Sequence, residues 1–460
     1  MFRKYIGDRS FYRRVMQIGI PIMIQNGITN FVSLLDNIMV GQIGTMQMGG
    51  VAVVNQLIFV FNLCIFGATS GAGIFTAQYY GKQDHDGIRH TFRIKFLIGL
   101  AFCAVFLGLF ALCPVPLIRL YLQGEGSAAD IAATLQYGRQ YLFIMLFGLI
   151  PFALSSVYST TLRECGQATI PMIAGTVAVF VNLFLNYVLI FGHFGAPAMG
   201  VQGAAIATVI SRYVELAIVG VWTHLHHKEH PFIRGAYRSM YVPGRLLRQF
   251  FLRSTPLMIN EILWALAVVF LNQCYSTCGL DVMNAVNISG TVVNLTNVVT
   301  QALGITIGIL MGQFMGSGHT KEQVMDANRK LIFLALVCGI LFGGVQASIA
   351  TVFPGLYNTT ASIRLLAAQM ILITAICKPI TSCMYCAYYT IRSGGKTVVT
   401  FLYDSGTLWV LTIPLAFCLS RFTDISILPL FILCQIPDAI KTCIGLCIVK
   451  KGAWVQNITV

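Results

Sequence analysis

Long apolar stretches recur along the whole chain, and short polar segments between them carry most of the charge. A helix needs about 20 apolar residues to cross a bilayer, because lipid cannot hydrogen-bond an exposed backbone. Each stretch reaches that length, so the pattern predicts an all-α polytopic membrane protein with about twelve transmembrane helices. We expect these helices near 14–40, 50–80, 93–114, 132–162, 168–191, 201–223, 248–276, 283–315, 331–353, 363–391, 398–420 and 426–449.

Composition supports this class, and the placement of the charges adds a topology. Hydrophobic residues make up 57% of the 460 residues and charged residues only 10%, whereas a soluble domain is about 25% charged. The net charge of +14 gathers at both chain ends and in alternate connections, which the positive-inside rule places in the cytoplasm. We therefore expect a multi-pass protein of the cell membrane with both termini cytoplasmic, and no nucleic-acid partner. Basic residues on this side include Arg13, Arg14, Lys82, Arg89, Lys228, Arg234, Arg238, Lys321, Arg329, Lys450 and Lys451.

The two halves of the chain resemble each other. The segment "IPIMIQN" matches "TPLMINE" and places Pro21 and Pro256 at the same depth in the first helix of each half. A proline in a helix removes a backbone hydrogen bond and permits a bend. The predicted domains are an N-terminal lobe (1–223), a cytoplasmic connection (224–247) and a C-terminal lobe (248–460).

A second match occurs at the same offset of 235 residues. It pairs Gln78 and Gly81 of "AQYYG" with Gln313 and Gly316 of "GQFMG". Two matches at one offset indicate a parallel internal repeat, which is typical of transporters that bind their substrate between two lobes.

Four polar residues interrupt the apolar stretches of the first half. Asp36 lies late in the first stretch, Asn182 and Asn186 share one helix face four residues apart, and Thr208 lies in the sixth stretch. Polar and ionisable residues within membrane helices commonly mark ion or substrate paths. Their oxygens could serve a proton relay or bind Na⁺. The alternatives are an Asp at the outer interface and hydrogen bonds that only hold helices together.

Three charged residues lie within the second half. Glu261 follows Pro256, Asp404 lies in the eleventh stretch and Lys378 lies deeper in the tenth. Opposite charges at similar depths predict that they neutralise one another in a wet cavity, or that Asp404 and Lys378 form a static ion pair. Arg212 and Glu215, three residues apart, are expected to form a structural pair.

The stretch "HLHHKEH", residues 224–230, resembles a metal-binding cluster in composition. It lies where the sixth helix should enter a basic connection, so a solvated loop is the favoured interpretation. The chain has no nucleophile elbow, P-loop or dinucleotide-binding motif in a suitable context. We therefore expect neither an enzyme nor a cofactor.

Several motifs resemble the multidrug and toxic compound extrusion (MATE) family, including its bacterial NorM-like and DinF-like members. They are "LLDNIMVGQIG", "SGAGIFTAQYYGKQD", "LRECGQATIPM", "NLFLNYVLIFG", "GAAIATVISR" and "DSGTLWVLTIPLA". The resemblance covers nearly the whole chain. It implies twelve helices in two lobes and exchange of H⁺ or Na⁺ for organic, often cationic, compounds that leave the cell.

The resemblance also implies roles for single residues. Asp36 corresponds to the first-helix carboxylate, with Pro21 as the associated bend and Asn182 and Thr208 as its polar partners. Asn186 differs from members that have Asp there, and Glu261 corresponds to a seventh-helix carboxylate.

NorM members add an Asp in the tenth helix, where this chain has Thr381 and, one turn away, Lys378. An ammonium there would repel Na⁺, so we expect no NorM-type Na⁺ site in the C-terminal lobe. Na⁺-dependent transport that Glu261→Gln abolishes and Lys378→Ala retains would contradict this expectation.

The favoured function is a monomeric secondary antiporter of drugs or lipophilic cations within the lipid bilayer. Two alternatives remain open at this point. A lipid-linked saccharide flippase of related fold would need a more cationic cavity. A non-transporting scaffold or receptor would not need Asp36 or Glu261.

Overall fold

The structure is a computed structural model, and it describes residues 5–122, 128–423 and 425–459, without the side chains of residues 33, 34, 37, 38 and 128. Helices are the only regular elements among these residues. Eleven of the helical segments described are long and apolar enough to cross a membrane. A further helix, α1 (Arg9–Gly41), has 33 residues and a length of about 50 Å. The predicted all-α membrane protein with about twelve long helices is confirmed.

The chain divides into two compact units that do not follow the chain order strictly. Unit 1 comprises residues 1–23, 77–83 and 248–460, and unit 2 comprises residues 24–76 and 84–247. The division within α1 falls two residues after Pro21. The predicted lobes 1–223 and 248–460 stay a prediction.

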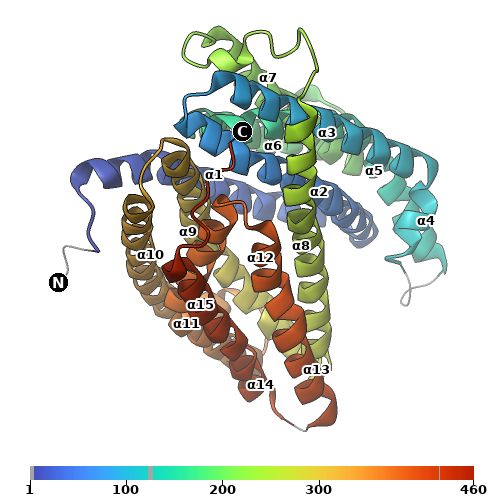
Figure 1. Cartoon of the computed structure of the whole chain (residues 1–460). Coiled ribbons are helices and arrows are strands. Elements are labelled where there is room, and N and C mark those ends of the chain that lie inside the picture. The colour runs from blue at the N-terminus through green and yellow to red at the C-terminus, as the bar shows by residue number, and fades with distance from the viewer. Residues whose placement is uncertain (1–4, 123–127, 424, 460) are drawn as a thin grey trace. The chain divides into compact units, whose positions relative to one another are not determined.

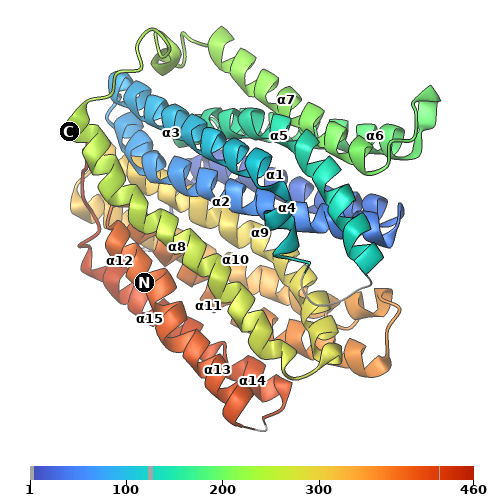
Figure 2. The same ribbon diagram turned by 90° about the vertical axis from the view of Figure 1, so that its right-hand side faces the viewer.

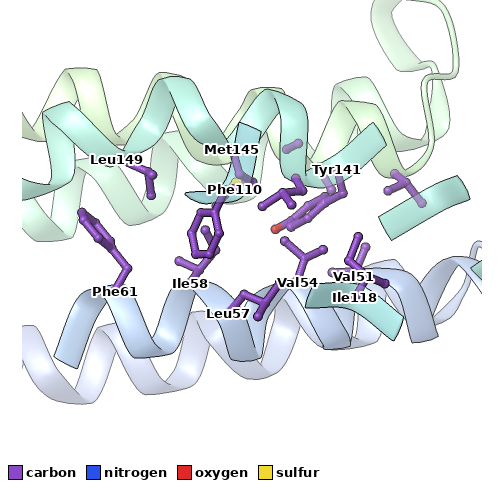
Figure 3. Packing of buried hydrophobic residues seen from close by; sticks show 14 of the residues in the cluster. Val51, Val54, Leu57, Ile58, Phe61, Phe110, Ile118, Tyr141, Met145 and Leu149 are labelled. Atoms are coloured by element: carbon purple, nitrogen blue, oxygen red, sulfur yellow. The ribbon is translucent and has the colours of Figure 1, made fainter. Parts of the chain in front are cut away.

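Unit 2 is a bundle in which α5 packs against α3 and α7, and α7 packs against α6 (Figure 2). An apolar cluster fills it, with Val54, Phe61 and Ala153 wholly buried (Figure 3). Its helices are most of α2 (Thr45–Gly81), α3 (His85–Leu112), α4 (Pro114–Arg119), α5 (Ala128–Glu164), α6 (Thr169–Phe191) and α7 (Val201–Leu225). Single 3₁₀ turns follow α6 (His193–Gly195) and α7 (Pro231–Ile233).

Unit 1 is built around α11, which packs against α9, α10 and α15. The last two predicted stretches form a hairpin: α12 and α13 lead to one end of the unit, and α14 and α15 return (Figure 1). The helices are α8 (Gly244–Ser276), α9 (Leu280–Gly316), α10 (Lys321–Ile349), α11 (Ala361–Ser393), α12 (Thr397–Phe401), α13 (Ile413–Phe422), α14 (Ile427–Leu433) and α15 (Ile436–Lys451). A 3₁₀ turn (Phe353–Leu356) precedes α11, and two π-helical turns, η5 (Leu402–Gly406) and η6 (Leu408–Thr412), separate α12 from α13.

Polar helical turns extend several helices beyond the apolar stretches. The clearest case is α10, which begins at Lys321, ten residues before the predicted 331. Thr320 and Gln323 form a capping box there, because each side chain accepts a hydrogen bond from the backbone N–H of the other residue. Hydropathy identifies only the part of a helix inside lipid, so it misses such turns.

The repeated glycines make reciprocal close contacts within unit 1. A Cβ atom added to Gly81 would collide with the backbone oxygen of Gln313, and one added to Gly316 would collide with that of Gln78. The ends of α2 and α9 can therefore approach only because both positions lack a side chain. The offset of 235 residues in the sequence thus corresponds to a symmetric contact in space.

The two equivalent glutamines are buried and each holds one end of the chain in unit 1. Gln78 Nε2 donates to the carbonyl oxygen of Gln456 at 3.1 Å, and its Oε1 accepts from the backbone N–H of Ile458 at 2.8 Å. Gln313 Oε1 accepts from Arg14 Nη2 at 2.7 Å. These bonds explain why residues 77–83 belong to unit 1.

We expect Gly316→Ala to destabilise the protein by about 1–3 kcal/mol, because the methyl group forces the ends of α2 and α9 apart. Thermal unfolding in detergent measures this. Gly290→Ala in the same helix is the matched control, since nothing lies within 4 Å of its added Cβ. It should gain up to about 1 kcal/mol from helix propensity. Equal midpoints for the two variants would contradict the close contact.

Candidate functional site

Asp36, Asn182, Asn186 and Thr208, which we call the Asp36 site, come together in unit 2. Asn186 Nδ2 donates to Asp36 Oδ1 at 2.7 Å. The hydrogen-bond pattern orients the Asn182 amide with its nitrogen 3.0 Å from Asp36 Oδ2 and its oxygen 3.2 Å from Thr208 Oγ1. Three helices therefore supply the site: α1 gives the carboxylate, α6 the two amides and α7 the hydroxyl. The carboxylate is half-buried, and both amides are buried.

The Asp36 site borders the apolar cluster of unit 2. Val40, Ile190 and Ala204 belong to that cluster, and each lies four residues from a site residue on its own helix. Tyr141 on α5, also in the cluster, donates toward Asn55 Oδ1 at 3.4 Å (Figure 3). One side of the site is thus closed by packed apolar side chains, which strengthens any electrostatic change at the carboxylate.

Arg212 is the cation that acts on Asp36. It forms the expected pair with Glu215, with 3.4 Å between Arg212 Nη1 and Glu215 Oε2, so that prediction is confirmed. Its guanidinium also lies 4.8 Å from the ring centroid of Phe152. The pair keeps Arg212 fixed on α7 without a direct bond to Asp36.

Unit 1 contains a larger polar network, centred on Asp404. Lys441 Nζ on α15 lies 2.5 Å from Asp404 Oδ1, and Asn260 Nδ2 donates to Asp404 Oδ2 at 2.8 Å. Ser405 donates back to Asn260 Oδ1 at 2.7 Å. Asp404 and Ser405 lie in the π-helical turn η5, whose wider backbone permits them to face Asn260.

Glu261 joins the same network through Arg392 and Tyr388 on α11. Arg392 Nη1 lies 3.8 Å from Glu261 Oε1 and donates to the Tyr388 hydroxyl oxygen at 3.1 Å. Asn260 Nδ2 also approaches that hydroxyl, at 3.4 Å. One chain of contacts, which we call the unit 1 network, thus links two carboxylates and two cations. Its members are Glu261, Arg392, Tyr388, Asn260, Asp404 and Lys441.

The expected role of Lys378 as the counter-charge is wrong. Its Nζ donates to Thr296 Oγ1 at 2.9 Å and to Asn297 Oδ1 at 2.6 Å, and these partners are neutral. Lys441 and Arg392 take the positions that Lys378 was expected to fill. Depth along a helix is readable from sequence, but the direction in which each helix face points is not. Glu261 and Asp404 do share one network, as their depths suggested.

We expect Lys378→Met to change stability by less than about 1 kcal/mol, or to increase it. The ammonium is 2% exposed, and burying it is costly because none of the ion pairs among the described residues includes it. Met has a similar length and no charge. Thermal unfolding of the purified variant checks this, and a loss of several kcal/mol would indicate a counter-charge that compensates the ammonium.

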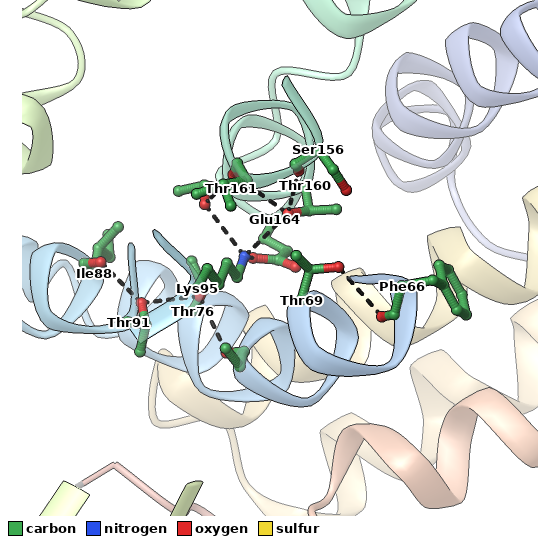
Figure 4. A network of polar contacts seen from close by, with 12 residues as sticks. Phe66, Thr69, Thr76, Ile88, Thr91, Lys95, Ser156, Thr160, Thr161 and Glu164 are labelled. Carbon is green, nitrogen blue, oxygen red and sulfur yellow. Dashed lines mark hydrogen bonds and ion pairs between the residues drawn. The ribbon is translucent and has the colours of Figure 1, made fainter. Parts of the chain in front are cut away.

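A second buried ion pair in unit 2 was not anticipated from the sequence. Lys95 Nζ on α3 lies 2.5 Å from Glu164 Oε2 on α5 and donates to Thr161 Oγ1 at 3.2 Å (Figure 4). Both residues were predicted to lie at or beyond helix ends. The missed signal is that α3 begins at His85, so Lys95 lies nearly three turns inside it.

Arg392 and Lys441 were missed for similar reasons. Arg392 was counted among the cytoplasmic basic residues, but it is 4% exposed inside α11. Lys441 is 7% exposed in α15. A lone Lys within the last apolar stretch could have been found by the same argument that selected Lys378.

The histidines of 224–230 pack against aromatic rings, so the expectation of a solvated loop is wrong for several of them. His226 stacks on Trp222 with ring centroids 4.2 Å apart, and His230 is 6% exposed. Burial lowers the pKa of His230 below its usual range. No group of three metal-ligating side chains comes together in the part of the chain that the structure describes.

Both prolines lie inside continuous helices: Pro21 in α1 and Pro256 in α8. Their roles as bends stay a prediction.

The chain was compared with known families and proteins. The MatE family model matches residues 21–188 and 256–418, which together exceed half of the chain. This chain belongs to the MatE family. The two matched segments begin at Pro21 and Pro256, so the family model repeats with the same offset of 235 residues. As a MatE protein it is a transporter and not an enzyme.

Relatives and solved structures agree with this membership. A probable multidrug resistance protein NorM of Thermotoga maritima is 24% identical over 99% of this chain and 96% of its own. The probable multidrug resistance protein YoeA of Bacillus subtilis is 25% identical over 92% and 90%. A mutant of the Vibrio cholerae MATE transporter VcmN has a TM-score of 0.84 at 17% identity, over 96% of this chain and 97% of that one. These matches favour the predicted efflux transporter over the flippase and scaffold alternatives.

Proposed function

We propose that this MatE protein exports organic cations in exchange for H⁺, with Asp36 as the site that binds the proton. The observation that supports H⁺ over Na⁺ is the orientation of the two amides. The nitrogen atoms of Asn182 and Asn186 face the carboxylate, so the positions that a metal cation would take are occupied by donors.

The same amides suit both protonation states. A charged Asp36 accepts from the two NH₂ groups. An amide that turns over presents its oxygen, which can accept a hydrogen bond from a protonated carboxyl group. Asn186 Oδ1 is buried without a hydrogen-bond partner in the described structure, so it is available for that exchange.

Coupling then follows from charge. A charged Asp36 at the edge of an apolar cluster favours a conformation in which water or a substrate cation reaches it. Protonation removes that preference and releases the cation. We propose Pro21 as the hinge, because the division between the two units falls two residues beyond it.

We also propose that the protein acts as a monomer in the cell membrane with both termini cytoplasmic. The basis is the concentration of basic residues at the chain ends and in alternate connections.

The test uses purified protein in liposomes that contain a fluorescent lipophilic cation. A pH gradient and a Na⁺ gradient are imposed separately on identical vesicles. We expect the pH gradient alone to move the dye. Movement driven only by Na⁺ would overturn H⁺ coupling, and no movement under either gradient would overturn the exchange.

A further inference from the structure

An open groove lies between α3, α5 and α7 of unit 2, away from the Asp36 site. Its volume is about 470 Å³, within the range of pockets for small ligands, about 300–1,000 Å³. Phe96, Leu154, Leu216, Val221 and Leu225 form its apolar walls. Figure 2 shows the three helices running alongside one another, with the segment that follows α7 at one end.

The apolar part of the groove faces the bilayer. Val221 is 58% exposed and Leu225 is 71% exposed, although both lie in a membrane-spanning helix. Large apolar side chains in such positions contact lipid chains and not water. A hydrocarbon chain can therefore reach the groove sideways from the membrane.

One end of the groove is polar and rigid. The Tyr158 hydroxyl lies 2.5 Å from the Tyr237 hydroxyl and 3.1 Å from His224 Nε2. The Tyr237 ring packs edge-on against Phe96, with centroids 5.4 Å apart. Tyrosine and histidine with an apolar body and a polar tip are typical of the membrane–water boundary.

The segment that closes this end is basic. Residues 226–243 contain Lys228, Arg234 and Arg238 against the single acidic residue Glu229. Arg234 and Arg238 are exposed on either side of the turn that ends in Tyr237. No residue that lines the groove is acidic.

Arg93 on α3 holds this segment in place. Its guanidinium donates to the carbonyl oxygens of Ala236 and Gly235, each at 2.9 Å, and to that of Tyr241 at 3.0 Å. The side chain is buried and its acceptors are neutral, so it adds positive charge beside the groove.

We propose that this groove is a specific site for an anionic phospholipid. One acyl chain lies between α3, α5 and α7, and the phosphate contacts Arg234 and Arg238 beyond the Tyr158–Tyr237 end. Basic pockets between membrane helices on the cytoplasmic side select anionic headgroups in this way. The basic segment disfavours a lipophilic cation as the occupant, because like charges would meet. The site is independent of the proposed H⁺ exchange.

Gly220 provides a direct test, because it lines the groove and has nothing within 4 Å of an added Cβ. Gly220→Leu should fill the groove without a clash. The matched control is Gly108→Leu on α3, where the added Cβ also meets nothing within 4 Å. Gly108 lies twelve residues, or about 18 Å, from Phe96 along α3. Both variants replace a helical glycine by a good helix former, so neither should lose the fold.

The headgroup contact is tested by the double variant Arg234→Gln and Arg238→Gln. Arg119→Gln is its control, since Arg119 is exposed at the opposite end of α3 and α5, next to α4. Full-length protein is delipidated in detergent, titrated with phosphatidylglycerol or phosphatidylcholine, and analysed by native mass spectrometry. Competition with tetraphenylphosphonium is measured in parallel.

We expect the wild type to bind phosphatidylglycerol at least about tenfold more tightly than phosphatidylcholine, as two lost or gained charged contacts would give. Gly220→Leu and the double Arg variant should each reduce that binding at least about fivefold, while both controls bind as the wild type does. Equal binding of the two lipids, unchanged binding in Gly220→Leu, or equal loss in the controls would each overturn the site. Displacement of the lipid by tetraphenylphosphonium would instead identify a substrate site.

Discussion

Asp36→Asn is expected to lower gradient-driven dye export to about one hundredth of the wild-type rate or less. A carboxamide binds no proton between pH 5 and 9, so a pH gradient has no differential effect on the two conformations. The substitution preserves shape, and Asn at position 36 can still bond the amides of Asn182 and Asn186. The fold should therefore survive, which thermal unfolding of the same preparation checks.

The control for this variant is Asp86→Asn on α3. The Asp86 side chain is 77% exposed and pairs only with Arg89, three residues away, so we expect its export rate to match the wild type. Downhill dye efflux without any gradient should persist in Asp36→Asn, because the substrate path is intact. Full gradient-driven export by Asp36→Asn would exclude Asp36 as the coupling site and leave it a structural residue.

Lys441→Met is expected to destabilise the protein by about 3–5 kcal/mol, because it leaves the Asp404 carboxylate buried without its counter-charge. The Lys441 side chain is 8% exposed and that of Asp404 is 17% exposed. Adding Asp404→Asn to Lys441→Met should restore most of the loss, since the double variant buries no charge. Reversible unfolding in detergent, measured as a double-mutant cycle, gives the coupling between the two residues.

Two substitutions of the same kind serve as controls. Lys330 lies 2.7 Å from Asp326, but the Asp326 side chain is 42% exposed, so Lys330→Met should cost less than about 1 kcal/mol. Lys378→Met is buried but removes no ion pair, and it should cost as little. Similar losses in all three variants would show that chain length at these positions, and not charge compensation, determines stability.

The sequence by itself determined the membrane class, the helices and the internal repeat, because each depends on local information. A hydrophobic run of 20 residues has only one stable form in lipid. The offset that pairs Gly81 with Gly316 is visible in the letters alone, and both residues proved to lie where two backbones meet. Asp36, Asn182, Asn186 and Thr208 could be grouped beforehand because each is a rare polar residue in an apolar stretch.

Partners across helices were decided only by the tertiary structure. A sequence gives the depth of Lys378, Arg392 and Lys441, but it does not give the rotation of α11 and α15 about their axes. Asp404 therefore pairs with Lys441 and Glu261 with Arg392, while Lys378 faces Thr296 and Asn297. The π-helical turn at Asp404 changes that rotation further, and no local pattern announced it. The groove of unit 2 arises in the same way, since its walls come from three helices whose contact faces depend on packing.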